Sequence, residues 1–260
     1  MELRHIHHIG KRESQQDSWH KGKFDSQCGE FAIAIVADGV GGAPGGSWAS
    51  FVATRAYERQ LHVFATGERH TLKSFRGHCE NARRAASRQI ARDSKGDPDL
   101  GDASTTLSAC VIINGLAFFT NIGDSPILVG NKKGVRVVSR EHSRAAQLAA
   151  AGVLTREEYE DSPFRGVLAS YISMYENTSI DAYYAREELE HLDRVILCTD
   201  GAMEAAEIAG MACACSQAWI ENASHQLERA IQAFASDNAT LVIIGGDDTH
   251  ALDELTFEEA

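Results

Sequence analysis

The chain has 260 residues, of which 43% are hydrophobic and 24% are charged, a composition typical of a globular protein with a sizeable core. Its formal net charge is -12, because 37 acidic side chains outnumber 25 basic ones. A polyanion needs neutralising cations, so this charge argues against nucleic acid or an anionic membrane as the main ligand.

The N-terminal segment and the cysteines predict a reduced, cytoplasmic protein. Residues 1–14, MELRHIHHIGKRES, contain no apolar signal core, and no apolar run approaches the ~20 residues that span a membrane. The six cysteines are scattered, and we expect reduced thiols that serve mainly as core residues; they are Cys28, Cys79, Cys110, Cys198, Cys213 and Cys215. A monomer is the default expectation.

Apolar, often alternating runs bounded by Gly, Asn or Asp predict the strands. In chain order these runs are residues 30–37, 104–114, 116–120, 126–129, 135–139, 194–199 and 240–245. Asn114-Gly115 predicts a hairpin with a type I′ turn, and GNKKG at 130–134 predicts a second hairpin. Near the N-terminus, His5, His7 and His8 fit an exposed first strand better than a metal site.

Helical periodicity is clear in residues 47–65, 71–92 and 224–234. Strands in hairpin-like succession between long helices favour an α+β fold with antiparallel sheets. Residues 152–193 are less periodic, which predicts an irregular segment that contains a short strand. We expect one domain over residues 1–250 and a solvated acidic tail, ALDELTFEEA, at 251–260.

The glycines that follow Asp38 in VADGVGGAPGG admit two interpretations. They allow a close backbone approach at a functional site, because only glycine tolerates such turns. Alternatively, they form a flexible connection to a helix capped by Ser47. The P-loop spacing and its lysine are absent from this stretch.

Five aspartates stand where apolar runs meet Gly, Ser, Thr or Asn: Asp17, Asp38, Asp124, Asp200 and Asp237. Each one alone is typical of a turn, where the carboxylate accepts nearby backbone N–H groups. If the sheets bring them together, the carboxylates cannot all stay ionised without a cation. Mg²⁺ and Mn²⁺ prefer such oxygen ligands, and the sequence has no His/Cys cluster at zinc spacing.

These residues lie in segments that resemble the type 2C metal-dependent Ser/Thr protein phosphatases (the PPM family), bacterial type. The eight matching segments follow the family order over nearly the whole chain: RESQQDS, VADGVGG, ASTTLSACVI, NIGDSPILV, REHS, AGVLTREEYEDSPFRGVLAS, VILCTDG and DNATLVII. The resemblance implies a four-layer α-β-β-α sandwich of two mainly antiparallel sheets flanked by helices. It also implies that residues 152–193 form a flap beside the active-site cleft.

The resemblance assigns roles to individual residues. Asp38 is expected to bridge two divalent ions, Mn²⁺ or Mg²⁺, and the carbonyl of Gly39 to ligate one of them. Asp200 and Asp237 complete the inner set, Asp17 holds metal-bound water, and Asp124 holds a third, weaker ion. Arg12, five residues before Asp17, is expected to bind the substrate phosphate through its planar donors.

The implied function is hydrolysis of phosphoserine and phosphothreonine in proteins by direct attack of a water that bridges the two ions. The implied partners are phosphoproteins that are targets of a Ser/Thr kinase. An alternative is a catalytically silent module of the same fold that binds a signalling partner, and a third reading is a metal-dependent nuclease or nucleotide hydrolase.

Some positions depart from the family pattern, which keeps the silent alternative open. Gln15-Gln16 replaces Asn-Glu, Pro126 replaces an arginine, and Glu141 replaces an aspartate beside His142. Val40 stands where eukaryotic members carry a histidine, so the leaving oxygen is expected to take its proton from water. All the expected inner metal ligands are kept.

Overall fold

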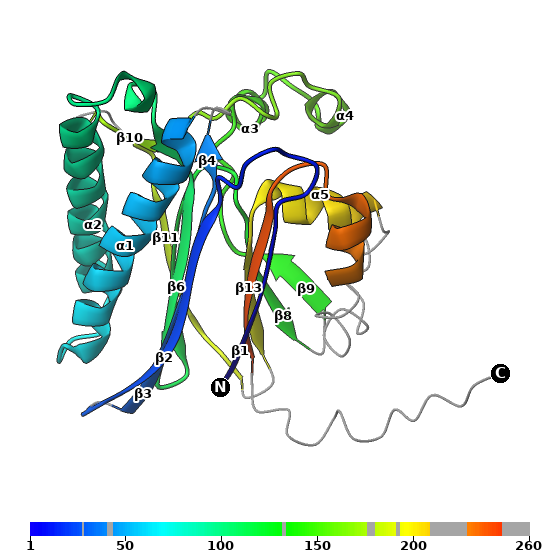
Figure 1. Ribbon diagram of the computed structural model, residues 1–260. Helices are drawn as coiled ribbons and strands as arrows, with labels where there is room; N and C mark the ends of the chain where they lie inside the picture. Colours follow the sequence, from blue (N-terminus) through cyan, green and yellow to red (C-terminus); the bar gives the residue numbers. More distant parts are fainter. Residues whose placement is uncertain are drawn as a thin grey trace.

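The computed structural model describes residues 1–27, 29–40, 44–131, 134–175, 180–190, 193–208 and 228–245. Two five-stranded sheets, antiparallel throughout, pack face to face, and helices cover the outer face of each sheet (Figure 1). The fold is therefore the four-layer α-β-β-α sandwich that the sequence predicts.

Strand order shows how distant segments become neighbours. The first sheet has the order β11-β7-β6-β3-β2, with bounds Tyr183–Glu188, Leu116–Ile122, Leu107–Ile113, Gly29–Ala37 and Ser18–Ser26. The second has the order β1-β13-β12-β8-β9, with bounds Glu2–His8, Ala239–Gly245, Arg194–Cys198, Ile127–Asn131 and Gly134–Val137. A small sheet, β10-β5-β4, comprises Ile172–Ser173, Ser104–Thr105 and Gly39–Val40.

Long helices cover the first sheet and shorter ones the second. α1 (Pro44–Thr66) and α2 (Leu72–Asp93) pack on the first sheet, while α5 (Asp200–Ile208) and the helical residues 228–234 lie against the second (Figure 1). The remaining helices are η1 (Pro98–Leu100), α3 (Arg144–Ala150) and α4 (Arg156–Glu160). α3, α4, β4 and β10 gather at one end of the sandwich (Figure 1).

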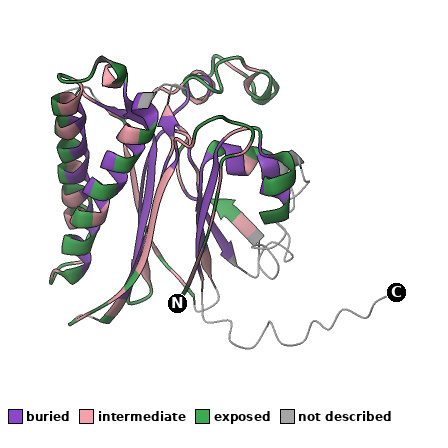
Figure 2. Ribbon diagram, in the orientation of Figure 1, coloured by how far each residue is buried: buried purple, intermediate pink, exposed green. Residues whose placement is uncertain are grey.

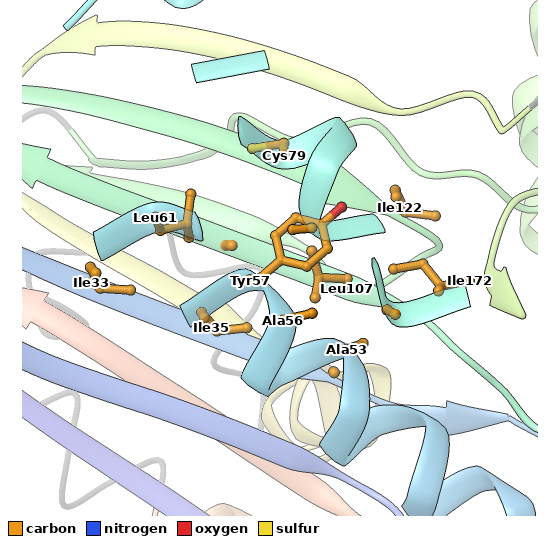
Figure 3. Close-up of a cluster of buried hydrophobic side chains, with 14 of the residues drawn as sticks. Ile33, Ile35, Ala53, Ala56, Tyr57, Leu61, Cys79, Leu107, Ile122 and Ile172 are labelled. Atoms are coloured by element: carbon orange, nitrogen blue, oxygen red, sulfur yellow. The ribbon is translucent and has the colours of Figure 1, made fainter. Parts of the chain in front are cut away.

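β3 is buried on both faces, which explains its continuous apolar run. Phe31, Ile33 and Ile35 pack with α1 and α2, whereas Ala32, Ala34 and Val36 face the second sheet. Figure 3 shows Tyr57 and Leu61 of α1 beside the isoleucines of this strand. The buried strands form the centre of the molecule in Figure 2. Burial of each large aliphatic side chain stabilises the fold by about 1.5–3 kcal/mol.

Most predicted elements are present, and several details differ; the short helices α3, α4 and α5 were not predicted. Asn114 (φ 50°) and Gly115 (φ 74°) form the predicted turn between β6 and β7. Helix α1 begins at Pro44, so Ser47 is inside the helix and is not its cap; proline fits the first helical position, where no N–H partner is needed. The predicted strand 104–114 is two strands, interrupted at Thr106. β2 was not predicted, because its lysines, glycine and histidine obscure the alternation.

The structure describes three of the six cysteines and the first strand. Cys79, Cys110 and Cys198 are buried free thiols, and burial raises the pKa of each; Cys28, Cys213 and Cys215 lie outside the described residues. The histidine-bearing first strand is β1, where His5 stacks on Trp19 with ring centroids 3.9 Å apart. The 251–260 tail is also outside the described residues.

No helix in the described part of the chain is both long and apolar enough to cross a membrane.

Candidate metal centre and phosphate site

Asp38 is positioned where two adjacent strands break together. The chain leaves β3 for the small strand β4 at Asp38, and leaves β5 for β6 at Thr106. The backbone N–H of Asp38 donates to Thr106 Oγ1 at 3.0 Å, and the N–H of Thr106 donates to the Asp38 carbonyl at 2.9 Å. Thr105 Oγ1 donates to the same carbonyl at 2.8 Å. These bonds hold the Asp38 backbone and leave its side chain for the cleft.

Gly39 is needed at this break because the chain passes close to two other segments. Its N–H donates to the Gln16 carbonyl at 3.2 Å. A Cβ at this position would lie closer than 3.0 Å to the backbone of both Gly46 and Gln16. The close-approach interpretation therefore applies to Gly39, although the neighbouring Gly41 and Gly42 lie outside the described residues.

Asp17 is held by two hydroxyl donors, one in β13 and one in the residue that follows β12. Thr240 Oγ1 donates to Asp17 Oδ2 at 2.6 Å, and Thr199 Oγ1 donates to the same oxygen at 3.0 Å. The other oxygen, Oδ1, is buried and has no hydrogen-bond partner. Burial raises the pKa of Asp17 to about 6, although the two hydroxyl bonds oppose the shift. The unpartnered oxygen is an available ligand atom.

Asp200 and Asp237 stand at neighbouring strand ends of the second sheet. Asp200 follows β12 and opens α5, where its Oδ1 accepts the N–H of Gly201 at 2.7 Å. Asp237 precedes β13; its Oδ1 accepts the N–H of Asn238 at 2.7 Å. Its Oδ2 accepts a hydrogen bond from Arg12 Nη2 at 2.6 Å, in an ion pair. The β12–β13 pairing therefore brings these two carboxylates to one end of the sandwich.

Asp124 approaches from the first sheet, just after β7. Gly123 before it has φ +103°, a conformation that L side chains rarely adopt. The N–H of Gly123 donates to Nδ1 of the buried His142 at 3.1 Å, which fixes the turn. Burial is the first cause that raises the pKa of Asp124 to about 7, followed by the charges of Asp200 and Glu141.

The structure brings six of the seven predicted site residues to the lining of one cleft of about 170 Å³. Its lining residues are Arg12, Gln16, Asp38, Gly39, Val40, Thr106, Asp124, Gly166, Leu168, Asp200, Asp237 and Asn238. Asp17 does not line the cleft, but its charge is close enough to raise the pKa of Asp38. Gly166 and Leu168 belong to the irregular segment at 152–193, so part of that segment borders the cleft.

The electrostatics of this cleft favour a cation. Burial raises the pKa of Asp38 well above its ordinary value, and the charges of Asp17 and Asp200 raise it further. Burial likewise raises the pKa of Asp200, and the charge of Asp237 raises it further. Carboxylates this close cannot all be ionised without a compensating positive charge.

The donor set fits hard divalent ions. The ligand atoms on offer are carboxylate and carbonyl oxygens, including the unpartnered Oδ1 of Asp17, and Mg²⁺ and Mn²⁺ prefer such atoms. Among the described residues no three His, Cys, Asp or Glu side chains are already grouped as ligands of one ion. The carboxylates of Asp38, Asp124, Asp200 and Asp237 are nevertheless gathered in one cleft.

Sequence reasoning missed the polar residues that support the carboxylates. Asn238 Oδ1 accepts the N–H of Gln16 at 2.8 Å, and its amide donates to the carbonyls of Ile9 and Ser14. Gln15, a departure from the family pattern, accepts the N–H of Asp17 at 2.9 Å through Oε1. The sequence did offer one signal for these supporting residues, namely that they neighbour predicted site residues in the chain. Asn238 follows Asp237, and the buried Thr199 precedes Asp200.

The chain is similar in sequence and in fold to known proteins. A model of the protein phosphatase 2C family matches residues 6–211. The serine/threonine phosphatase stp of Listeria welshimeri is 24% identical over 173 residues, covering 65% of this chain and 66% of that protein, just under two thirds of its length.

Solved structures share the fold. The serine/threonine phosphatase of S. agalactiae has a TM-score of 0.76 and 23% identity, covering 95% of this chain and 99% of that one. The catalytic domain of the serine/threonine protein phosphatase PstP, in complex with two manganese ions, has a TM-score of 0.63 and 20% identity, covering 93% and 96%.

Proposed function

Because this chain belongs to the protein phosphatase 2C family, we propose that it is a metal-dependent serine/threonine protein phosphatase. Its substrates are phosphoserine and phosphothreonine in proteins that a Ser/Thr kinase has phosphorylated. One observation carries the proposal: carboxylates from separate strand ends of both sheets meet in one cleft that also contains an arginine. The names of the relatives support the same activity.

The residues that would hold two divalent ions are Asp38, Asp200 and Asp237, with the carbonyl of Gly39; Asp17 would hold water bound to them. Asp124 would hold a third, weaker ion. When bound, the paired ions supply an activated water and offset negative charge on the phosphoryl group. The PstP structure with two manganese ions supports Mn²⁺ as the ion to test first.

The protein's own groups bind and orient the substrate. Arg12 lines the cleft, and its guanidinium can give two parallel hydrogen bonds to phosphoryl oxygens. Val40 lines the cleft without a proton to give, so the departing serine or threonine oxygen takes its proton from water.

A cysteine nucleophile has no support among the described thiols. Cys198 is the described cysteine nearest the site in sequence, next to Thr199, and its thiol is buried. Burial raises its pKa and keeps it protonated, whereas nucleophilic attack requires the thiolate. Direct hydrolysis without a phosphoenzyme is therefore the proposed route.

Phosphate release from phosphothreonine and phosphoserine peptides tests the function. We expect turnover with Mn²⁺ and loss of turnover when a chelator replaces the ion. Asp38→Asn should abolish activity, while Asp25→Asn, the same change at an exposed position of β2, should leave it intact. If the folded, Mn²⁺-loaded protein releases no phosphate, the enzyme proposal is wrong and the partner-binding alternative stands.

A further inference from the structure

A second hollow lies between α1, α2 and the segment that follows β10. Its volume is about 470 Å³, larger than the 170 Å³ of the catalytic cleft. Four of its lining side chains are cationic, namely Arg59, Arg88, Arg92 and Lys95, and none of the described lining residues is acidic. Val52 and Met174 contribute apolar surface. We call this hollow the basic groove.

The cations of the basic groove follow a regular spacing. Arg88, Arg92 and Lys95 stand at i, i+4 and i+7, so they share one side of α2 and the residues just beyond its end. Arg59 comes from α1. The helix macrodipole favours cations in the last turn, which accounts for Arg92 and Lys95 but leaves the charge of Arg59 on α1 to be explained.

The nearest acidic side chain on α2 is already engaged by neutral donors. Trp48 Nε1 donates to Asp93 Oδ2 at 3.0 Å, and Gln89 Nε2 donates to both carboxylate oxygens at 2.9 and 3.0 Å. Arg92 donates to the neutral side-chain carbonyl of Gln89. The groove therefore presents positive charge on a chain whose net charge is -12.

The small sheet connects the basic groove to the catalytic cleft. Met174 directly follows β10, which pairs with β5, and β5 pairs with β4. Gly39 and Val40 of β4 line the cleft. Two strand spacings of about 4.8 Å separate β10 from β4, or roughly 10 Å. An extended peptide covers that distance in about three residues.

We propose that the basic groove binds an acidic segment of the phosphoprotein substrate, beginning about three residues from the phosphorylated serine or threonine. This inference rests on the proposed phosphatase function. Aspartate and glutamate side chains pair with the four cations, and an apolar residue between them packs on Val52 and Met174. A long polyanion such as RNA would extend beyond the groove over a strongly acidic protein, which disfavours it.

Steady-state kinetics on two phosphothreonine peptides test the proposal. One peptide carries Asp and Glu at three to eight residues from the phosphothreonine, and the other carries Asn and Gln there; both flanks are compared. We expect the wild-type protein to have a lower KM for one acidic peptide. The double variant Arg59→Gln/Arg92→Gln should raise that KM about fivefold, since exposed ion pairs are individually weak.

Matched controls separate the groove from the cleft. Lys73→Gln removes one charge at the other end of α2, about 28 Å along the helix from Arg92, and should change neither KM. The double variant should hydrolyse p-nitrophenyl phosphate at the wild-type rate, because that small substrate does not reach the groove. Raised salt should reduce the preference for the acidic peptide.

Each outcome is decisive. Equal KM values for the acidic and neutral peptides in an active wild-type protein overturn the groove proposal and leave the phosphatase function standing. If no peptide is hydrolysed, the proposed function fails, and fluorescence anisotropy with the unphosphorylated acidic peptide then tests the groove by itself. Equal binding to wild type and double variant, or preferred binding of an RNA oligomer, overturns the groove as an acidic-peptide site.

Discussion

Thr240 Oγ1 donates a hydrogen bond of 2.6 Å to Asp17 Oδ2, joining residues 223 positions apart in the chain. Thr240 also lies 3.0 Å from Nδ1 of His7. A hydroxyl has one proton, so a threonine that donates to Asp17 must accept from His7. This chain of bonds fixes Asp17 from the side opposite its unpartnered Oδ1.

Thr240→Val should therefore weaken metal binding without removing a proposed ligand. Valine keeps the β-branched shape but cannot donate, so Asp17 loses one bond that lowers its pKa. Loss of such a supporting bond typically lowers metal affinity 10–100-fold. Calorimetric titration with Mn²⁺ measures the change, and Thr66→Val, at the exposed end of α1, serves as control. Unchanged Mn²⁺ affinity would contradict the supporting role.

The sequence alone was sufficient to single out the five aspartates as candidate site residues, because each one stands at the end of an apolar run. The β3 core run and the Asn114-Gly115 turn were equally visible, since burial and turn conformation leave strong local patterns. The metal-ligand roles themselves remain predictions. They came from the family resemblance, and local pattern alone would have assigned each aspartate to a turn.

What the sequence could not show depends on contacts between distant segments. Nothing local marks Thr240 as a donor to Asp17, because the bond exists only after β13 of the second sheet meets the residue that precedes β2 of the first. The break at Thr106 was missed for the same reason: it forms opposite the break at Asp38. The basic groove likewise requires α1, α2 and the residue after β10 to meet.

Ionisation of Asp124 should make the metal-free protein less stable as the pH rises. Its folded pKa of about 7 lies above the ordinary value of 3.8, so the folded state binds more protons in this range. The stabilisation is complete below about pH 4 and is lost as the pH rises to about 7. The free energy of unfolding falls by about 1.4 kcal/mol per pH unit over that window.

Asp124→Asn isolates this contribution from that of the other groups. Burial lowers the pKa of His142, which makes stability rise with pH and opposes the aspartate. Urea unfolding of both proteins with a chelator, at pH 5 and pH 8, gives the difference directly. The variant should gain stability relative to wild type at pH 8; a difference independent of pH would refute the raised pKa. Asp25→Asn should show no such change.

Gly39→Ala and Gly77→Ala should change stability in opposite directions. A methyl at Gly39 would meet the Gly46 and Gln16 backbones, so the strand break must shift, at a cost of about 1–3 kcal/mol. That shift also displaces Asp38, and activity should fall.

Gly77 is inside α2 with no atom near its Cβ position, so alanine should stabilise the protein by about 0.5–1 kcal/mol. Thermal unfolding and phosphate release measure both effects; a tolerated Gly39→Ala would contradict the close approach.

Arg12 and Asp237 allow substrate binding to be separated from metal binding. Arg12 is 54% exposed and donates to Asp237 at 2.6 Å, so it can turn to a phosphate when one enters the cleft. Arg12→Gln should lower kcat/KM for a phosphopeptide about 10–100-fold, mainly through KM, and Arg12→Lys should recover part of the loss because lysine keeps the charge but not the paired donors.

The same Arg12→Gln change should not lower Mn²⁺ affinity, because it releases the Asp237 carboxylate from an ion pair. Asp237→Asn should have the opposite pattern. It should weaken Mn²⁺ binding and have little effect on the KM for the phosphopeptide. Arg69→Gln, an equal change in an exposed position after α1, should alter neither quantity. If Arg12→Gln instead reduces Mn²⁺ affinity and leaves KM unchanged, the arginine holds the metal ligand in place and does not bind the phosphate.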